Sequence, residues 1–313
     1  MRIGIDFGGT KVEAAALDDA GNVVKRIRTA NPGGYDLAVS CVRDLVRAIE
    51  SDLGRRCPVG IGAPGSVSPT TGLMRNSNSL YLNGRRFKED LDAALDRPVR
   101  IANDADCFAL SEATDGAGAG AKTVFGVILG TGCGGGLVVD GQLIQGANGI
   151  GGEWGHVPLP WADQSETPGP ECYCRQKGCL EQWISGTGLQ RDYRVQTGHS
   201  FTGEEIVQAA ANADLEAGAA LNRLIDRLGR ALALVCNIVD PNAIVIGGGL
   251  SHVSEIYPTL PDIISSYAFS DAWTAKIAPA RWGGSSGVRG AARLWSYDDS
   301  ISLSFQAGDV EAR

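Results

Sequence analysis

The sequence has 313 residues, of which 43% are hydrophobic and 20% are charged, and its formal net charge is −8. The length allows two domains, while the acidic balance argues against nucleic acid as a partner, because such binding needs a basic surface. No apolar run is long enough to cross a membrane and no signal-like segment opens the chain, so we expect a soluble, cytoplasmic protein without a membrane partner.

The first third of the chain predicts a three-stranded β-meander followed by alternating helices and strands. The meander consists of apolar strands over 2–6, 12–17 and 23–28, with a glycine turn after the first and a polar turn after the second. Apolar residues then recur at helical spacing over 37–53. Four more elements follow in order: a strand over 59–63, a helix over 87–95, a strand over 99–102 and a helix over 105–113.

The same order of elements returns in the second part of the chain. Strands over 123–129, 137–139 and 142–145 are separated by a glycine turn at 130–136 and by a tight Asp140-Gly141 hairpin. The chain is then mainly helical over 203–239 and continues with a buried strand over 243–246 and the run Gly247-Gly248-Gly249. A repeated meander with a glycine turn in each copy predicts two similar lobes that face a cleft.

The two glycine turns are candidate phosphate-binding sites. Residues 130–135 fit the pattern G-x-G-x-x-G, but a strand follows where a dinucleotide-binding unit needs a helix. A Walker A loop is also absent, because Lys11 follows Gly9-Thr10 without a Gly-Lys-Ser/Thr sequence. Each turn is an ordinary hairpin or a cradle of backbone N–H groups for an anion, and two at equivalent positions favour the cradle. Asp6, at the end of the first strand, can hold Mg²⁺ through water or cap its own turn.

A histidine and a cysteine cluster predict a metal site. One imidazole and three thiols are the ligand set of a closed tetrahedral zinc site, and here they are His156, Cys172, Cys174 and Cys179. Because four protein ligands leave no open position, the zinc is expected to be structural. Glu153 and Glu181 flank this set without belonging to it, which favours a substrate pocket organised by the metal. The remaining cysteines have apolar neighbours and are interpreted as buried thiols: Cys41, Cys57, Cys107, Cys133 and Cys236.

Asp104 is the candidate catalytic residue. Asn103-Asp104 falls at the end of a predicted strand just before a helix, where a carboxylate can project into the cleft. Phosphoryl transfer needs a group that accepts the proton of the acceptor hydroxyl, and Asp104 suits that role. The alternative is that Asp104 only caps the helix.

These motifs together resemble known families. Residues 6–11, 129–136 and 246–250 resemble the phosphate-1, phosphate-2 and adenosine segments of the actin-like ATPase and sugar-kinase superfamily. Gly-Glu-Trp-Gly-His at 152–156 with Cys-x-Cys-x4-Cys resembles the zinc signature of the ROK (repressor, open reading frame, kinase) sugar kinases, and the likeness covers residues 1 to about 295. One departure is Arg175, where relatives usually have glycine after the second cysteine.

The resemblance implies an α/β, two-lobed actin-like ATPase (ribonuclease H-like) fold with duplicated β-meander lobes and an active-site cleft between them. The expected division is a small N-terminal lobe over 1–117, a large C-terminal lobe with the zinc segment over 118–288, residues 289–300 packing back on the first lobe, and a tail over 301–313. The stretch Gly287–Ala292 resembles the second connection between the lobes.

The resemblance also implies the site residues and the partners, which are ATP and a sugar, with related kinases commonly forming dimers. Asp104 is the implied catalytic base. The implied ATP and Mg²⁺ contacts are Gly4, Ile5, Asp6, Phe7, Gly8, Gly9, Thr10, Lys11, Gly130, Thr131, Gly132, Cys133, Gly134, Gly135, Gly136, Gly247, Gly248 and Gly249. The implied sugar contacts are Ser66, Asn78, Asn83, Gly84, Asn103, Asp104, Glu153, His156 and Glu181.

The loops at 76–84 and 158–161 most resemble those of bacterial fructokinases, so the sequence predicts phosphorylation of fructose to fructose 6-phosphate. Glucokinase and N-acetylglucosamine kinase are the alternatives, since small contacts decide the choice of sugar. Two other classes are a sugar-sensing repressor and a non-catalytic sugar-binding module. The acidic charge and the start of the first strand at Arg2 oppose the repressor, and Asp6 and Asp104 oppose the non-catalytic module.

Overall fold

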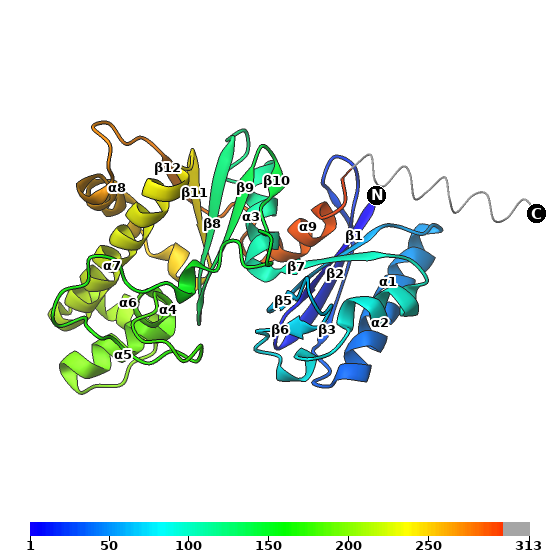
Figure 1. The fold of residues 1–313 in the computed structure, drawn as a ribbon, viewed down its shortest axis with the longest axis horizontal. Helices are drawn as coiled ribbons and strands as arrows, with labels where there is room; N and C mark the ends of the chain where they lie inside the picture. The colour runs from blue at the N-terminus through cyan, green and yellow to red at the C-terminus, as the bar shows by residue number, and fades with distance from the viewer. Residues whose placement is uncertain (297–313) are drawn as a thin grey trace, which may run out of the picture.

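Two five-stranded sheets with the same topology organise this computed structural model, which describes residues 1–296 (Figure 1). The first sheet has the order β3-β2-β1-β4-β7 and the second the order β10-β9-β8-β11-β12. In each sheet the first three strands along the chain form an antiparallel meander, and the last two run parallel to the meander's first strand. The predicted duplication of a meander-based lobe is confirmed.

The first sheet carries its helices on one face. Its strands are β1 (Arg2–Phe7), β2 (Lys11–Leu17), β3 (Val23–Ala30), β4 (Val59–Ala63) and β7 (Val99–Asn103). Helices α1 (Tyr35–Leu53) and α2 (Phe87–Leu95) cover the face to which Ile3, Ile5 and Phe7 point. A short hairpin, β5 (Ser66–Val67) and β6 (Met74–Arg75), lies beyond the end of β4.

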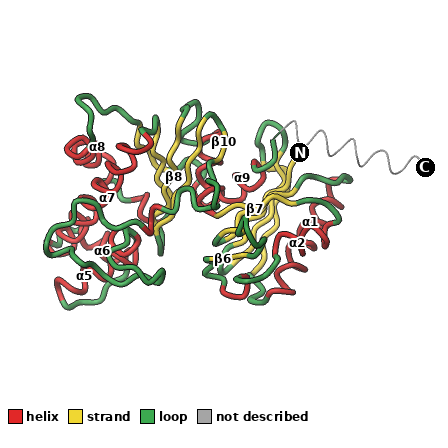
Figure 2. Tube along the Cα trace, in the orientation of Figure 1, coloured by secondary structure: helices red, strands yellow, loops and turns green. Residues whose placement is uncertain are grey.

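The second sheet is built in the same way. Its strands are β8 (Thr123–Leu129), β9 (Cys133–Val139), β10 (Gln142–Leu143), β11 (Ala243–Gly247) and β12 (Lys276–Pro279). Phe125, Val127 and Leu129 point to a core formed with the long helix α7 (Leu215–Val239) and α8 (Ile256–Tyr267). The short helices α4 (Glu181–Ile184), α5 (Gly186–Thr197) and α6 (Gly203–Ala211) pack along this side of the lobe (Figure 2). Within residues 1–296, no helix is both long and apolar enough to cross a membrane.

Two helices connect the lobes, and each packs on the sheet of the other half. Helix α3 (Asp104–Asp115) follows β7 of the first sheet but packs on β8 and β9, whereas α9 (Ser286–Arg293) follows β12 but packs on β1 and β4 (Figure 1). The two helices cross where the Cα of Gly290 meets the backbone of Cys107. The expected boundary at residue 117 therefore places α3 in the N-terminal lobe, although the helix packs on the sheet of the C-terminal lobe.

The predicted elements before residue 116 all form, with ends within two residues of those expected. One prediction for the second meander is wrong: the glycine turn does not span 130–136, because β9 begins at Cys133 and includes Gly134, Gly135 and Gly136. Gly134 and Gly136 let α3 approach the strand, since a Cβ at Gly136 would lie 2.7 Å from the Ala105 carbonyl oxygen. The sequence predicts that residues 289–300 pack on the first lobe; α9 contacts β1 and β4, while residues 297–300 and the tail at 301–313 lie outside the described residues.

Replacing Gly290 by alanine should disrupt the helix crossing. An added Cβ would lie 1.6 Å from the Cys107 carbonyl oxygen, so α3 and α9 would have to move apart. We expect a loss of about 3 kcal/mol or more in the free energy of unfolding, measured by chemical denaturation. The control is Gly218→Ala in α7, where no atom lies within 4 Å of the new Cβ and a gain of about 0.5–1 kcal/mol is expected. Equal effects of the two substitutions would contradict the packing described.

Candidate functional site

The first glycine turn lies between β1 and β2 and is held in shape by backbone and side-chain contacts. The Gly8 N–H donates to the Lys11 carbonyl at 3.0 Å, and the Asn31 amide donates to the Gly8 carbonyl at 2.7 Å. Gly9, Thr10 and Lys11 are exposed. The predicted contacts Gly4 and Ile5 lie deeper in β1, where Gly4 packs under the backbone of Val288 and Ile5 belongs to the core. Packing accounts for these two residues without a nucleotide.

The second glycine turn is shorter than predicted and consists of Gly130–Gly132. Its carbonyl groups are occupied by the start of α5, since the Gly186 N–H donates to Gly130 at 2.8 Å and the Thr187 hydroxyl donates to Thr131 at 2.9 Å. A Cβ at Gly248 would lie 2.4 Å from the Leu129 carbonyl oxygen. The structure therefore brings the predicted adenosine segment at 247–249 against the end of β8, next to the predicted phosphate segment.

Carboxyl groups from both lobes gather near the start of α3. The side chain of Asn103 caps this helix by accepting the Ala105 N–H at 2.8 Å, and Asp104 Oδ1 accepts the same N–H at 3.0 Å. Asp104 is exposed as a residue, while desolvation by the surrounding protein raises the pKa of its carboxyl group. Burial, followed by the charges of Asp104 and Glu13, raises the pKa of Asp6 to about 6. Asp6, near the end of β1, is thus close enough to Asp104, just after β7, for their charges to interact.

The glutamates that flank the metal ligands belong to the same group. Burial is the main cause of the raised pKa of Glu153, and the charges of Asp104 and Glu181 add to it. One oxygen of Glu181 accepts the Cys133 N–H at 3.2 Å, so this side chain supports the second glycine turn as well as facing Glu153. An arrangement of this kind can accept a proton from a hydroxyl group and can bind several hydroxyl groups, which is the chemistry that the sequence predicts.

The four predicted zinc ligands lie close together. Their donor atoms are all within 4.8 Å of one another, with Cys174 Sγ 3.5 Å from Cys179 Sγ and Cys172 Sγ 3.7 Å from His156 Nδ1. Tetrahedral zinc with sulfur at about 2.3 Å would separate two sulfurs by about 3.8 Å, so this donor set fits the ion. His156 would bind it through Nδ1, because Nε2 faces the Tyr173 hydroxyl at 2.9 Å. The resemblance implies that His156 also contacts the sugar, but in this structure its Nε2 is paired with the Tyr173 hydroxyl.

Arg175 occupies a backbone conformation that glycine favours. Its φ angle is 72°, in the left-handed region, and its N–H closes a turn onto the Cys172 carbonyl at 2.8 Å. This geometry explains why glycine suits the position in the resembling kinases. The ligand cluster forms in spite of the substitution, so the departure from the pattern moves no ligand away from the site.

The predicted sugar contacts outside the metal region are of two kinds: most shape or hold parts of the protein itself, and one, Asn78, is available to a ligand. Asn83 pairs with the backbone of Ser77 through two hydrogen bonds of 2.9 Å, and Gly84 has a φ angle of 75°, so both residues shape the loop. Asn103 caps α3 and donates to the Gly65 carbonyl at 3.2 Å. Ser66 accepts a hydrogen bond from Arg75 at 3.2 Å, while Asn78 is exposed and available to a ligand.

Three residues near the site were not singled out by the sequence. Asn31 and Tyr81, joined at 2.7 Å, support the first glycine turn; the Asn-Pro-Gly sequence at 31–33 signals a turn but not this contact. Asp106 is 5% exposed in α3, and its Oδ1 has no hydrogen-bond partner among the described residues. Burial is the main cause that raises the pKa of Asp106 to about 7, against a hydrogen bond with Gln145 that lowers it.

Replacing Asp106 by asparagine should stabilise the protein more at pH 8 than at pH 5. The unfolded chain loses this proton near pH 3.8 and the folded chain near pH 7, so the folded state is progressively disfavoured as the pH rises between these values. The difference corresponds to up to about 4 kcal/mol above pH 7, and asparagine removes it. Denaturant unfolding of both proteins at the two pH values measures the effect. A gain that does not depend on pH would show that Asp106 is not a buried titrating group.

Comparison with known proteins identifies the family of this chain. The family model described as the ROK family matches residues 2–298. The N-acetyl-D-glucosamine kinase of Photobacterium profundum is 39% identical over 299 residues, which cover 94% of this chain and 99% of the relative. The enzyme of the same name from Pectobacterium atrosepticum is 38% identical over 305 residues, covering 96% and 100%.

Solved structures share the architecture. The ROK hexokinase from Thermus thermophilus has a TM-score of 0.83 at 27% identity, covering 98% of this chain and 99% of that one. A ROK family glucokinase from Streptomyces griseus, solved with glucose and AMPPNP, has a TM-score of 0.75 at 28% identity, covering 94% and 98%. The predicted two-lobed actin-like ATPase fold is confirmed. With a family model that matches nearly its whole length and relatives well above 30% identity, this chain belongs to the ROK family and is one of its sugar kinases.

Proposed function

We propose that the chain is an ATP-dependent N-acetylglucosamine kinase that transfers the γ-phosphoryl group to the 6-hydroxyl of the sugar. The observation that carries this proposal is the likeness, over at least 94% of the chain, to relatives that are N-acetyl-D-glucosamine kinases. The fructose prediction from the loops at 76–84 and 158–161 has no comparable support, and its stated alternative is favoured. Asn83 and Gly84 shape the loop at 76–84. The resemblance of these two residues to those of fructokinases therefore reflects the geometry of the loop and not the identity of the sugar.

In this proposal Asp104 accepts the proton of the acceptor hydroxyl. Its raised pKa keeps it a stronger base than an ordinary aspartate, while Asn103 fixes the first turn of α3 beneath it. The N–H groups of the exposed turn residues Gly9, Thr10 and Thr131 are proposed to bind ATP phosphates, with Gly247–Gly249 beside the adenosine. Asp6 would hold Mg²⁺, which neutralises charge on the phosphates when bound.

The zinc proposal concerns structure rather than chemistry. His156, Cys172, Cys174 and Cys179 would hold the ion and fill its coordination sphere, so it would supply no activated water. What it would do is fix the loop that carries Glu153 before the ligands and Glu181 after them. Those two carboxylates are proposed to bind sugar hydroxyl groups, together with Ser66 and Asn78.

The proposal is tested by a coupled ADP-release assay with Mg-ATP and four sugars. We expect the highest kcat/KM with N-acetylglucosamine, ahead of glucose, mannose and fructose. A preference for fructose would restore the sequence-based prediction, and a preference for glucose would favour the other alternative. Absence of turnover on every sugar, in zinc-replete protein, would favour a non-catalytic sugar-binding module.

Asp104→Asn tests the catalytic role. We expect kcat to fall by about 10²–10⁴-fold, the range typical of a removed general base, while ATP binding by calorimetry is retained. In the parent enzyme, activity should be lost as the pH falls through the raised pKa of Asp104, because the base must be ionised. The control is Asp44→Asn on the exposed face of α1, which should not change kcat. Near-normal turnover of Asp104→Asn would assign the base to another residue.

A further inference from the structure

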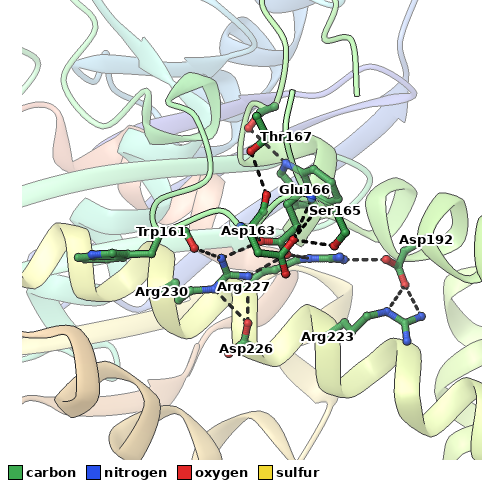
Figure 3. Close-up of polar contacts among 12 residues, drawn as sticks. Trp161, Asp163, Ser165, Glu166, Thr167, Asp192, Arg223, Asp226, Arg227 and Arg230 are labelled. Atoms are coloured by element: carbon green, nitrogen blue, oxygen red, sulfur yellow. Dashed lines mark hydrogen bonds and ion pairs between the residues drawn. The ribbon is translucent and has the colours of Figure 1, made fainter. Parts of the chain in front are cut away.

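A buried ionic network lies behind the metal ligands, in the region that the proposed chemistry does not use. We define the metal segment as residues 156–181, from His156 to Glu181. Glu166, midway along it, is 6% exposed and accepts four hydrogen bonds: one from Arg227 at 2.8 Å, two from Arg230 at 2.9 Å and one from the Asp163 N–H at 3.2 Å. Both arginines belong to α7, so this carboxylate fixes the segment on the longest helix (Figure 3).

Arg230 holds the backbone of the metal segment as well. Its guanidinium donates to the carbonyl oxygens of Pro160 at 3.2 Å and Trp161 at 3.0 Å, only a few residues after His156. It also binds Asp226 at 3.0 Å, one turn earlier on α7 (Figure 3). The part of the segment that follows His156 is therefore held through both its backbone and its side chains, although it contains no regular helix between His156 and Cys172.

Arg227 joins two parts of this region, which we call its arms. The first arm runs from His156 to Cys172, and the second runs from Gly178 to Trp183, just past the end of the metal segment. Towards the first arm its Nε binds Glu166, and towards the second its guanidinium lies 4.5 Å from the ring centroid of Trp183, two residues after Glu181. The Trp183 indole donates to the Gly178 carbonyl at 3.2 Å, next to Cys179. A third contact, to Asp192 of α5 at 2.7 Å, fixes Arg227 itself, because Asp192 is also held by Arg223 at 2.6 and 2.9 Å.

Stability alone does not explain such a network. Buried ion pairs recover little more than their own desolvation, and apolar residues of similar size often serve a core as well or better. What paired charges do fix is geometry, since an arginine fork accepts its partners only in one plane. Here the network fixes the residues that precede the first thiol ligand, Cys172, relative to those that follow the last thiol ligand, Cys179.

We propose that Glu166 and Arg227 are positioning residues for the sugar site, which hold both arms of the metal segment on α7 so that His156 and Glu181 are in register before metal or sugar binds. The inference rests on the proposed roles of these two residues in the kinase. The metal would fix the segment at its four ligands, and the ionic network fixes it on α7. Loss of either would leave the segment held by the other alone.

The test compares Arg227→Lys and Glu166→Gln with Asp226→Asn. Lysine keeps the charge of Arg227 but loses the fork and its contact over Trp183. Asp226 is matched as a control because it contacts the same network through Arg230 but has a side chain that is 51% exposed. For the full-length, zinc-loaded proteins, the measurements are the rate of zinc loss to a chelator, the KM for the preferred sugar and for Mg-ATP, and amide hydrogen exchange.

For the two anchor variants we expect zinc loss about tenfold faster and a sugar KM about tenfold higher, with the KM for Mg-ATP unchanged within about twofold. The amides of Leu159 and Leu180, which bind the Gly178 and Val157 carbonyls at 2.9 Å, should exchange faster, while those of α1 should not. The Asp226→Asn protein should match the parent in every measurement.

Unchanged zinc loss, sugar KM and exchange in folded Arg227→Lys and Glu166→Gln proteins would overturn the proposal. Faster exchange throughout the protein, α1 included, would do the same, since it indicates a role in global stability only. The exchange measurement is repeated on the metal-free proteins without substrate, so it tests the anchor even if the protein binds no zinc or prefers another sugar. A failure of the proposed function is therefore distinguishable from a failure of this inference.

Discussion

The crossing of α3 and α9 is the contact on which the rest of this structure depends. At its centre the Cα of Gly290 meets the Cys107 carbonyl, and no side chain separates the two helices. At its end the buried Glu112 carboxylate accepts N–H groups from Arg281 and Trp282 at 3.0 Å and the Ser286 hydroxyl at 2.8 Å. The last turn of one connecting helix is thereby bonded to the first turn of the other. Because Asp104 begins α3 and Gly287 of α9 lies against the Asp6 carboxyl, this junction also sets where the two acids meet.

The acidic group at the junction has an electrostatic consequence. Desolvation is the largest cause that raises the pKa values of Asp6, Asp104, Asp106 and Glu153, and the charge of Asp104 raises those of the other three further. A cluster of this kind disfavours full ionisation of the free protein and favours the arrival of cations. Cations such as Mg²⁺ and basic side chains such as Arg75, whose charge lowers the pKa of Glu153, are the groups that such a field attracts. The sequence shows which acids exist, but their mutual distances depend on strands that are far apart in the chain.

Local patterns sufficed to predict most of the framework. The meanders, the long helices and the end positions of Asp6 and Asp104 follow from alternation, helical spacing and glycine placement, all of which are properties of neighbouring residues. The short strand β12 and helix α8 went unpredicted; in α8 the buried residues Ile256, Leu260 and Ile264 do recur at helical spacing, but Pro261 interrupts the pattern. The glycine turn was placed too long because Gly134 and Gly136 are demanded by the close approach of α3, a helix from much earlier in the chain. In the same way, nothing beside Asn83 in the sequence reveals that its partner is the backbone of Ser77 rather than a sugar.

The exchange of connecting helices has a consequence for how the chain can be divided. The glycines of β1 and β4 present a bare strip to α9, and those of β8 and β9 present one to α3, so each sheet has one face that only the other half can cover. A fragment that stops after α3 would contain α3 without the second sheet, on which it packs, and the first sheet without α9. The duplicated lobes are therefore not two modules joined by a linker. They form one folding unit, in which each half completes the other's interior, and any split of the chain between α3 and β8 can restore structure only when both pieces are present together.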